Sequence, residues 1–210
     1  MSIVHKPWIG PNYKDSAEKI AILGYSHYLG GGHDYDGMTT DIINSITDET
    51  HIDHAANKKT PFFTKISGFF SGKSQASFWN DVIFLNFVTE AVGQRDEKYN
   101  WASHEMAVAG SERVFEVLIK NDVEKLFVFS AKAWVGLPTT ILEKKDVSLG
   151  TTNPHGFNVF VKAPKTIAFH LRHPQNAKPE ELKKLGEAVE LGMKQSPSEL
   201  HAAIERAKRN

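Results

Sequence analysis

The hydrophobic positions of this chain fall into short blocks whose spacing alternates between strand-like and helical. Uninterrupted apolar runs predict buried β-strands, because a strand that is covered on both faces needs no polar side. Hydrophobic residues three or four positions apart predict helices between these runs. The expected strands are 19–25, 81–88, the beginning of 124–138, 156–162 and 165–170. The expected helices are 39–56, 103–121 and the middle of 124–138.

The last part of the chain is expected to be helical. Residues 182–193 carry hydrophobic side chains at helical spacing, and the sequence SPSE at 196–199 is typical of a helix N-terminus. Strands that alternate with helices indicate an α/β fold with a mostly parallel sheet. We therefore expect one domain over residues 1–210, with 176–210 as a C-terminal helical extension.

The composition excludes several classes of protein. A chain of 210 residues can bury a substantial core in one domain. Lys and Arg together number 25, as do Asp and Glu, so the net charge does not indicate a generally basic surface for nucleic acid or membrane. The absence of cysteine excludes disulfides and thiol chemistry. No apolar run approaches the roughly 20 residues of a membrane span. We expect a soluble, cytoplasmic protein with no membrane partner.

The ends of the predicted strands are the places to look for a binding site. Ligands of open parallel sheets bind beyond the carboxyl ends of the strands, where loops surround a crevice. In this chain these ends carry several polar and ring-bearing side chains. They are residues 24–28, 86–89, 130–134 and 170–176.

Three consecutive glycines, residues 30–32, follow the first predicted strand. Glycine lets a backbone lie close to a ligand, but the spacing matches neither a P-loop nor a dinucleotide-binding fingerprint. The segment is either a surface loop or part of a binding site. Its His and Asp side chains, together with two later histidines, also permit a metal site, although they match no established ligand spacing. These side chains are His27, His33, Asp34, Asp36, His51 and His54.

Two polar positions at strand ends carry more information. Asn86 ends a very apolar strand, and a buried amide without hydrogen-bond partners costs about 1–3 kcal/mol. Its partner is either backbone or a ligand edge with one donor and one acceptor, such as a nucleobase. Another strand ends in IAFHLRHPQN. There we expect His170 to be a core histidine, and His173, which precedes a proline and is therefore extended, to point across a crevice.

In chain order, four short motifs resemble those of the uracil-DNA glycosylase superfamily. GYSHY at 24–28 follows the first strand, where that family has a G-Q-D-P-Y type of loop. IFLNFVT at 83–89 is similar to the family's L-L-L-N strand end, and FVFSAKAW at 127–134 loosely resembles a VFLLWG-like segment. RHPQ at 172–175 stands where the family has H-P-S. The resemblance implies a three-layer α/β/α domain around a mostly parallel, four-stranded sheet.

The same resemblance implies a DNA glycosylase, which holds a nucleobase out of the strand and hydrolyses its N-glycosidic bond without a cofactor. Asn86 would read the base edge, and His173 would donate a hydrogen bond to the departing base. Gly24 would let the base lie against the backbone, and Tyr28 would exclude larger bases. An aromatic ring would stack on the base, and we assign this role to Phe70. The other candidates for stacking are Phe62, Phe63 and Phe69.

The sequence departs from the family where water would be activated. Ser26 replaces the water-orienting acid, and His27 replaces a proline. A serine hydroxyl positions water but does not readily deprotonate it, whereas an imidazole does so near neutral pH. Asp34 or Asp36, if folded back by the glycines, could also supply the missing carboxylate. The family's apolar wedge is absent after HPQ, so single-stranded or already distorted DNA is the expected partner.

Two other functions stay open at this point. One is a catalytically inactive member of the same fold that binds nucleic acid or protein, and the other is a metal-assisted hydrolase that uses the glycine loop. Lysines interleaved with phenylalanines in residues 58–73 suit phosphates and bases, although lysines on loops above a Phe-rich core are equally ordinary. These lysines are Lys58, Lys59, Lys65 and Lys73.

Overall fold

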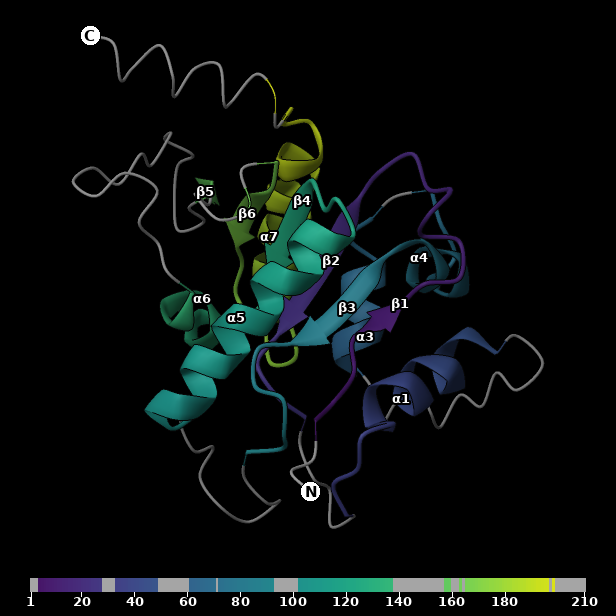
Figure 1. Cartoon of the computed structure of the whole chain (residues 1–210). Helices are drawn as coiled ribbons and strands as arrows, with labels where there is room; N and C mark the ends of the chain where they lie inside the picture. The colour runs from purple at the N-terminus through teal and green to yellow at the C-terminus, as the bar shows by residue number, and fades with distance from the viewer. Residues whose placement is uncertain are drawn as a thin grey trace, which may run out of the picture.

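The computed structural model describes residues 4–27, 33–48, 61–70, 72–92, 102–137, 163, 165–196 and 198, together with the backbone of 157–159. In these residues the chain forms an α/β fold in which one mixed sheet lies between two layers of helices (Figure 1). The described part of the sheet has six strands in the order β1-β3-β2-β4-β6-β5. They are β1 (Trp8–Ile9), β2 (Ile20–Gly24), β3 (Ile83–Asn86), β4 (Lys125–Val128), β5 (Phe157–Val159) and β6 (Ile167–His170).

The four inner strands of this sheet are parallel. β2 pairs with β3 on one side and β4 on the other, and β4 pairs with β6. These are four of the five strands that the uninterrupted apolar runs predict, and the fifth, expected over 156–162, is β5. The edge strands β1 and β5 are antiparallel to their neighbours, so the described sheet has six strands and not four. The two-residue strand β1 was not predicted, because so short a pairing leaves no periodic pattern in the sequence.

The described residues form six helices, and none of them is long and apolar enough to cross a membrane. Three of the helices begin with a serine whose side chain accepts a hydrogen bond from a backbone N–H in the first turn, as N-caps do. The helices α3 and α4 were not predicted, since seven residues are too few to show a helical period. The six are α1 (Met38–Thr47), α3 (Pro61–Ser67), α4 (Gln75–Asp81), α5 (His104–Lys120), α6 (Ala131–Gly136) and α7 (Pro179–Met193).

The core has two halves, one on each face of the sheet. On one face, small aliphatic side chains of the strands pack against α5 and α6, which Figure 1 shows in front of the sheet. On the other face, the strands pack against α1, α3, α4 and α7 through a cluster rich in aromatic rings. Alternation along each strand explains the division, because successive side chains point to opposite faces. The ring-rich half includes Phe63, Phe70, Phe78, Trp79, Phe84, Phe127, Phe129 and Phe169.

Several predictions fall on residues that the structure does not describe. The helix expected over 39–56 is described only to its end at Thr47 and the following Asp48. Tyr28, the three glycines of 30–32 and the helix expected from residue 196 onward also lie outside the described residues, apart from single positions at 196 and 198. The expected C-terminal helical segment is represented by α7, which packs on the ring-rich half of the core.

Candidate functional site

The carboxyl ends of the parallel strands meet at one edge of the sheet, and Asn86 ends β3 at this edge. It is aligned in register with Gly24, the last residue of β2. Asn86 and Phe84 are two residues apart on one strand, so their side chains leave the same face of the sheet. This is the ring-rich face, because Phe84 belongs to that half of the core.

The side chain of Asn86 lies over Gly24. A Cβ atom at residue 24 would lie 2.4 Å from Asn86 Oδ1, so glycine is the residue that leaves space for the amide here. Asn86 is only 3% exposed, and its Nδ2 atom has no hydrogen-bond partner among the described residues. A buried donor of this kind costs about 1–3 kcal/mol unless something accepts from it. The amide is therefore positioned to bind an acceptor that the described protein residues do not supply.

His173 lies in the turn that follows β6, and two contacts hold this turn. The Nδ1 atom of His173 accepts a hydrogen bond from the Gln175 N–H at 3.2 Å. The Lys65 ammonium, from α3, donates to the carbonyl oxygens of Pro174 at 3.1 Å and Gln175 at 2.8 Å. The turn after β6 is thus held by one hydrogen bond within the turn and by two from Lys65 of α3.

The environment of His173 makes its ring a neutral hydrogen-bond donor. Although His173 as a whole is an exposed residue, partial desolvation of its ring, followed by the charge of Lys65, holds the pKa of His173 below its ordinary value of 6.5. The neutral ring has one proton, and Nδ1 cannot carry it while it accepts from Gln175. The proton is therefore on Nε2, which is the atom that can donate to a ligand.

Phe62 connects His173 to the strand that carries Asn86. Its ring lies 4.8 Å from the ring of His173, and 6.1 Å from that of Phe84 on β3. A third neighbour is Phe129, directly after β4, at 6.5 Å. Asn86 and His173 thus lie at the same edge and on the same face of the sheet. The half-buried Phe62 ring lies against His173 on one side and against Phe84, from the strand of Asn86, on the other.

The structure places Phe70 in the core. Its ring is 7% exposed and stacks on Phe78 of α4 at 4.4 Å, with an edge contact to Phe127 in β4 at 5.3 Å. Phe63 is buried as well. Phe62 contacts His173, and the role that we assigned to Phe70 therefore moves to Phe62. Sequence spacing could not separate the rings, because all of them lie in or near the same short helix.

His27 is 6% exposed, and its Nε2 atom lies 2.6 Å from the Thr39 hydroxyl of α1. Its ring also meets the ring of His5 edge-on at 4.8 Å. Burial, and then the nearby His5, lowers the pKa of His27 to about 3, which makes it a weak base. Ser26 is half-buried and donates to the His27 carbonyl oxygen at 3.3 Å.

The two aspartates after the glycine loop bind the N-terminal segment and the chain after β3. Asp34 accepts from the Ala91 N–H at 2.8 Å, and its other oxygen lies 2.5 Å from His5 Nε2. Asp36 accepts from the Val4 N–H at 2.9 Å. Both carboxylates thus hold parts of the fold together at the carboxyl-terminal edge of the sheet.

A metal centre in the glycine loop has no geometric support in the described residues. Among them, no three His, Asp or Glu side chains are grouped so that they could hold a metal ion. The helper histidines of that hypothesis, His51 and His54, lie outside the described residues.

Arg113 of α5 joins the N-terminal segment to β3. Its guanidinium donates to the backbone carbonyl oxygens of both His5 and Asn86. Burial lowers the pKa of Arg113 to about 10, so the group is still a cation at pH 7. Its Nε atom has no hydrogen-bond partner among the described residues. The positive charge of Arg113 is therefore fixed next to the backbone carbonyl of Asn86.

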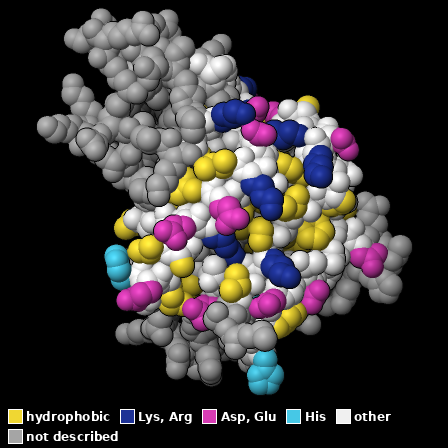
Figure 2. All heavy atoms as spheres, viewed as in Figure 1, with side chains coloured by type: hydrophobic (Ala, Val, Ile, Leu, Met, Phe, Trp, Pro, Cys, Tyr) yellow, Lys and Arg dark blue, Asp and Glu magenta, His cyan; other side chains and the backbone are white. Residues whose placement is uncertain are grey.

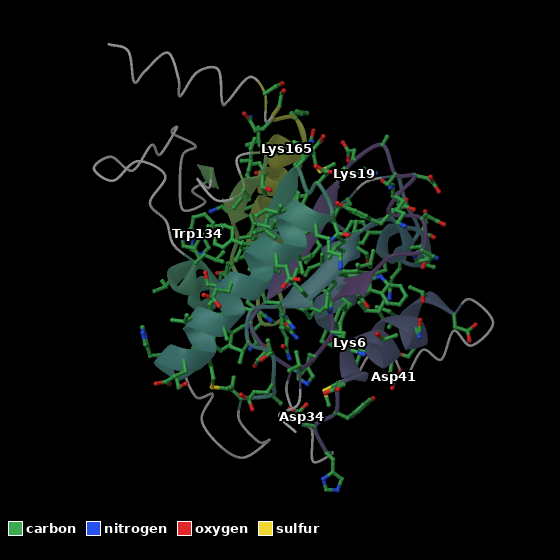
Figure 3. The ribbon with its side chains drawn as sticks, in the orientation of Figure 1. Lys6, Lys19, Asp34, Asp41, Trp134 and Lys165 are labelled. Atoms are coloured by element: carbon green, nitrogen blue, oxygen red, sulfur yellow. The ribbon has the colours of Figure 1, made fainter. Side chains whose placement is uncertain are left out.

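His170 lies on the other side of the sheet. It is next to Phe169, which faces the ring-rich half, so its own side chain points to the face covered by α6. There its ring stacks on Trp134, which is labelled in Figure 3, with a centroid distance of 5.0 Å and an interplanar angle of 7°. The expectation of a packed histidine at this strand end is thus in accord with its environment.

The lysines that we considered for DNA contact have protein partners where they are described. Lys65 holds the turn after β6, and Lys73 pairs with Asp81 at 2.6 Å. Lys58 and Lys59 lie outside the described residues. On the face covered by α5, Figure 2 shows basic and acidic side chains interspersed. This face therefore does not indicate a binding surface of uniformly positive charge.

Four residues of this edge were not identified from the sequence as a group: His5, Phe62, Lys65 and Arg113. His5 and Arg113 come from segments that carry no motif, and they approach Asn86 only because the chain folds. Neither stands out in the sequence, because Lys6 follows His5 and Glu112 precedes Arg113. The sequence therefore offered no signal for their position at this strand end.

Comparison of the chain with protein-family models and with curated protein sequences found no match.

Proposed function

We propose that this protein has a uracil-DNA-glycosylase-like fold and binds a nucleobase held out of a DNA strand, whose N-glycosidic bond it hydrolyses. The observation that carries this proposal is the buried Asn86 amide, whose Nδ2 atom lacks a partner among the described residues. A carboxamide presents one donor and one acceptor, which complements the pairing edge of a base.

His173 supports the chemical part of the proposal. When the glycosidic bond breaks, the base leaves with negative charge, and a fixed donor beside a base oxygen stabilises that charge. A neutral imidazole with its proton on Nε2 can make this hydrogen bond, and the turn already fixes that proton position. Lys65, bound to the same turn, adds positive charge nearby.

Phe62 supports the binding part of the proposal. Its half-buried ring lies against His173 and Phe84, on the face where the Asn86 amide points. Stacking of a base on an aromatic ring contributes about 1–3 kcal/mol, and it tolerates any base because every base has a π-face. The amide would then provide the selectivity.

The arrangement of the strands supports the proposed fold. Four parallel strands occur in the chain order that the motif resemblance implies, with helices on both faces. GYSHY begins at the last residue of β2, IFLNFVT runs through β3 and past its carboxyl end, and RHPQ begins two residues after β6. Since that end is where parallel sheets bind ligands, the motifs lie where the proposed chemistry requires them.

The direct test uses single-stranded oligonucleotides that each contain one uracil, 5-hydroxymethyluracil, hypoxanthine or xanthine. Alkali cleaves the strand wherever a base has been released. We expect cleavage at one of these bases, with at least a 100-fold slower release in Asn86→Ala and in His173→Ala. The matched controls are Asn44→Ala, at an exposed position of α1, and His104→Ala, at the exposed start of α5. Release of no base by the wild-type protein would contradict the catalytic proposal.

The second candidate is a binding module without catalysis. The low pKa of the buried His27 favours it. Ser26 is a poor base, and the buried His27 has a low pKa, so neither is well suited to deprotonate water. The same oligonucleotides separate the two candidates. Tight binding that depends on Asn86 but leaves every base in place would favour the binding module.

A further inference from the structure

The buried His5 and the half-buried Asp34 form a carboxylate–imidazole pair at the edge of the sheet that carries Asn86. His5 Nε2 lies 2.5 Å from Asp34 Oδ1, and His5 is 1% exposed. The second oxygen of Asp34 is held by the Ala91 N–H at 2.8 Å. Glycosidic hydrolysis needs a group that takes a proton from water, and the residues directly after β2 do not provide a good one.

The N-terminal segment reaches this edge because β1 runs antiparallel to β3. Residues before β1 therefore continue toward the carboxyl end of β3, where the His5 N–H donates to the Thr89 carbonyl oxygen at 2.6 Å. Figure 3 shows Asp34 and Lys6 at the end of the molecule toward which β2 and β3 point. The pair is thus assembled from two segments that are far from β3 in the sequence.

Contacts also connect the pair to the site itself. One guanidinium, that of Arg113, binds the carbonyl oxygens of both His5 and Asn86. The His5 ring meets the ring of His27, which is three residues beyond Gly24. His5 is therefore adjacent to the ends of both strands that form the Asn86 side of the site.

The carboxylate determines which nitrogen of His5 is basic. An ionised Asp34 only accepts hydrogen bonds, so the proton of neutral His5 is on Nε2 and points to Asp34. The lone pair is then on Nδ1, which is buried and has no hydrogen-bond partner among the described residues. A histidine that is oriented by a carboxylate and whose other nitrogen is unpaired is the arrangement of a general base.

We propose that His5 is the general base that activates the attacking water in this protein, and that Asp34 is its positioning residue. The inference rests on the proposed glycosidic hydrolysis, and it assigns to the N-terminal segment the role that the family's carboxylate after the first strand would have. His5 lies in none of the four motifs that resemble those of the glycosylase superfamily.

The reaction step is balanced as follows. The water oxygen forms a bond to the sugar carbon of the glycosidic bond, and one water proton moves to His5 Nδ1. The electron pair of the breaking carbon–nitrogen bond leaves with the base, whose negative charge is stabilised by Asn86 and His173. The base then takes up one proton, and His5 returns to its neutral form by releasing one. Water and the nucleoside unit thus give a free base and an abasic sugar.

The charged and titratable groups that face His5 are compatible with this role. Asp34 stabilises the imidazolium that forms when Nδ1 takes the proton. Arg113 opposes it, but its guanidinium binds the backbone carbonyl of His5. His27, with a pKa of about 3, is neutral at pH 7 and adds no charge.

The test measures single-turnover base release from the oligonucleotide of the panel that the wild-type protein cleaves. We expect His5→Gln and Asp34→Asn to slow release by about 100-fold to 10,000-fold. Binding of the same oligonucleotide with a 2′-fluoro substituent, which resists hydrolysis, should stay within threefold of wild type. This binding measurement also shows that the variants are folded, and His104→Gln at the exposed start of α5 is the matched control.

Two readouts separate a base from a residue that only supports the fold. The wild-type release rate should fall at acidic pH, and His5→Gln should lack this fall. In nitrogen-15 spectra of the wild-type protein, the His5 proton should be on Nε2, and Asp34→Asn should shift it toward Nδ1, because an amide can donate to Nε2.

The possible results separate this inference from the proposed function. If the wild-type protein releases a base and His5→Gln releases it within threefold of the same rate, the role of His5 is wrong and the glycosylase proposal stands. If the wild-type protein releases none of the panel bases, both are overturned. A His5 proton on Nδ1 in the wild-type protein would also overturn the role of His5.

Discussion

The side-chain oxygen of Asn86 occupies the space that a Cβ atom on Gly24 would need, with 2.4 Å between the two positions. Gly24→Ala should therefore displace the amide and abolish binding of a base, while overpacking lowers the stability of the protein by about 1–3 kcal/mol. Binding of the 2′-fluoro oligonucleotide and thermal unfolding measure the two effects. The control is Gly68→Ala, because a Cβ there has ordinary contacts of 3.4 Å or more. Equal binding by Gly24→Ala and the control would contradict the role of this contact.

Phe62 and Phe70 should respond differently to truncation. Phe62→Ala removes the ring beside His173, so we expect base binding to weaken by about 5- to 150-fold, which corresponds to the usual 1–3 kcal/mol of stacking. Phe70→Ala empties a core position and should lower the free energy of unfolding by about 3–5 kcal/mol. Denaturant unfolding and oligonucleotide binding distinguish these patterns. A larger binding defect in folded Phe70→Ala than in Phe62→Ala would restore the role predicted from the sequence.

Lys65 should keep His173 neutral and its turn in place. Lys65→Met removes the hydrogen bonds to the carbonyls of Pro174 and Gln175 and also the positive charge. The charge lowers the pKa of His173, so its loss should raise that pKa toward 6.5. A proton NMR titration of the His173 ring measures the change, and Lys65→Arg is the charge-preserving control. An unchanged pKa in Lys65→Met would show that desolvation alone sets the protonation of His173.

His27 should make the protein less stable in acid. Burial lowers its pKa from 6.5 to about 3 in the folded protein, so between these values only the unfolded chain takes up the proton. The contribution of His27 is therefore complete above pH 6.5 and is lost as the pH falls toward 3. The slope is at most about 1.4 kcal/mol per pH unit.

Denaturant unfolding between pH 7 and pH 4 measures this slope. His27→Gln retains a side chain that can bind the Thr39 hydroxyl and does not titrate, so its stability should depend less on pH than that of the wild type. The exposed His104→Gln should keep the wild-type slope. If His27→Gln and the wild type lose stability in parallel, the buried histidine is not the group responsible.

The resemblance of short motifs led to two of the residues at this site, and their local surroundings explain why. Asn86 interrupts a very apolar strand, and a proline follows His173, so both stand out in the sequence alone. Ser26 and His27 stood out in the same way, but the fold buries His27 against Thr39 and His5. A sequence motif shows that a residue is unusual, and it does not show whether that residue faces a ligand or the interior.

The hydrophobic pattern by itself determined the four parallel strands and the longer helices, because burial of apolar side chains is a local periodic property that each segment carries on its own. The tertiary structure decided which residues meet at the sheet edge. Phe62 rather than Phe70 contacts His173, and His5 reaches Asp34 and Arg113 from the N-terminal segment. These contacts join segments distant in sequence, and their free energy exists only after the chain has closed, so no pattern within a single segment could specify them.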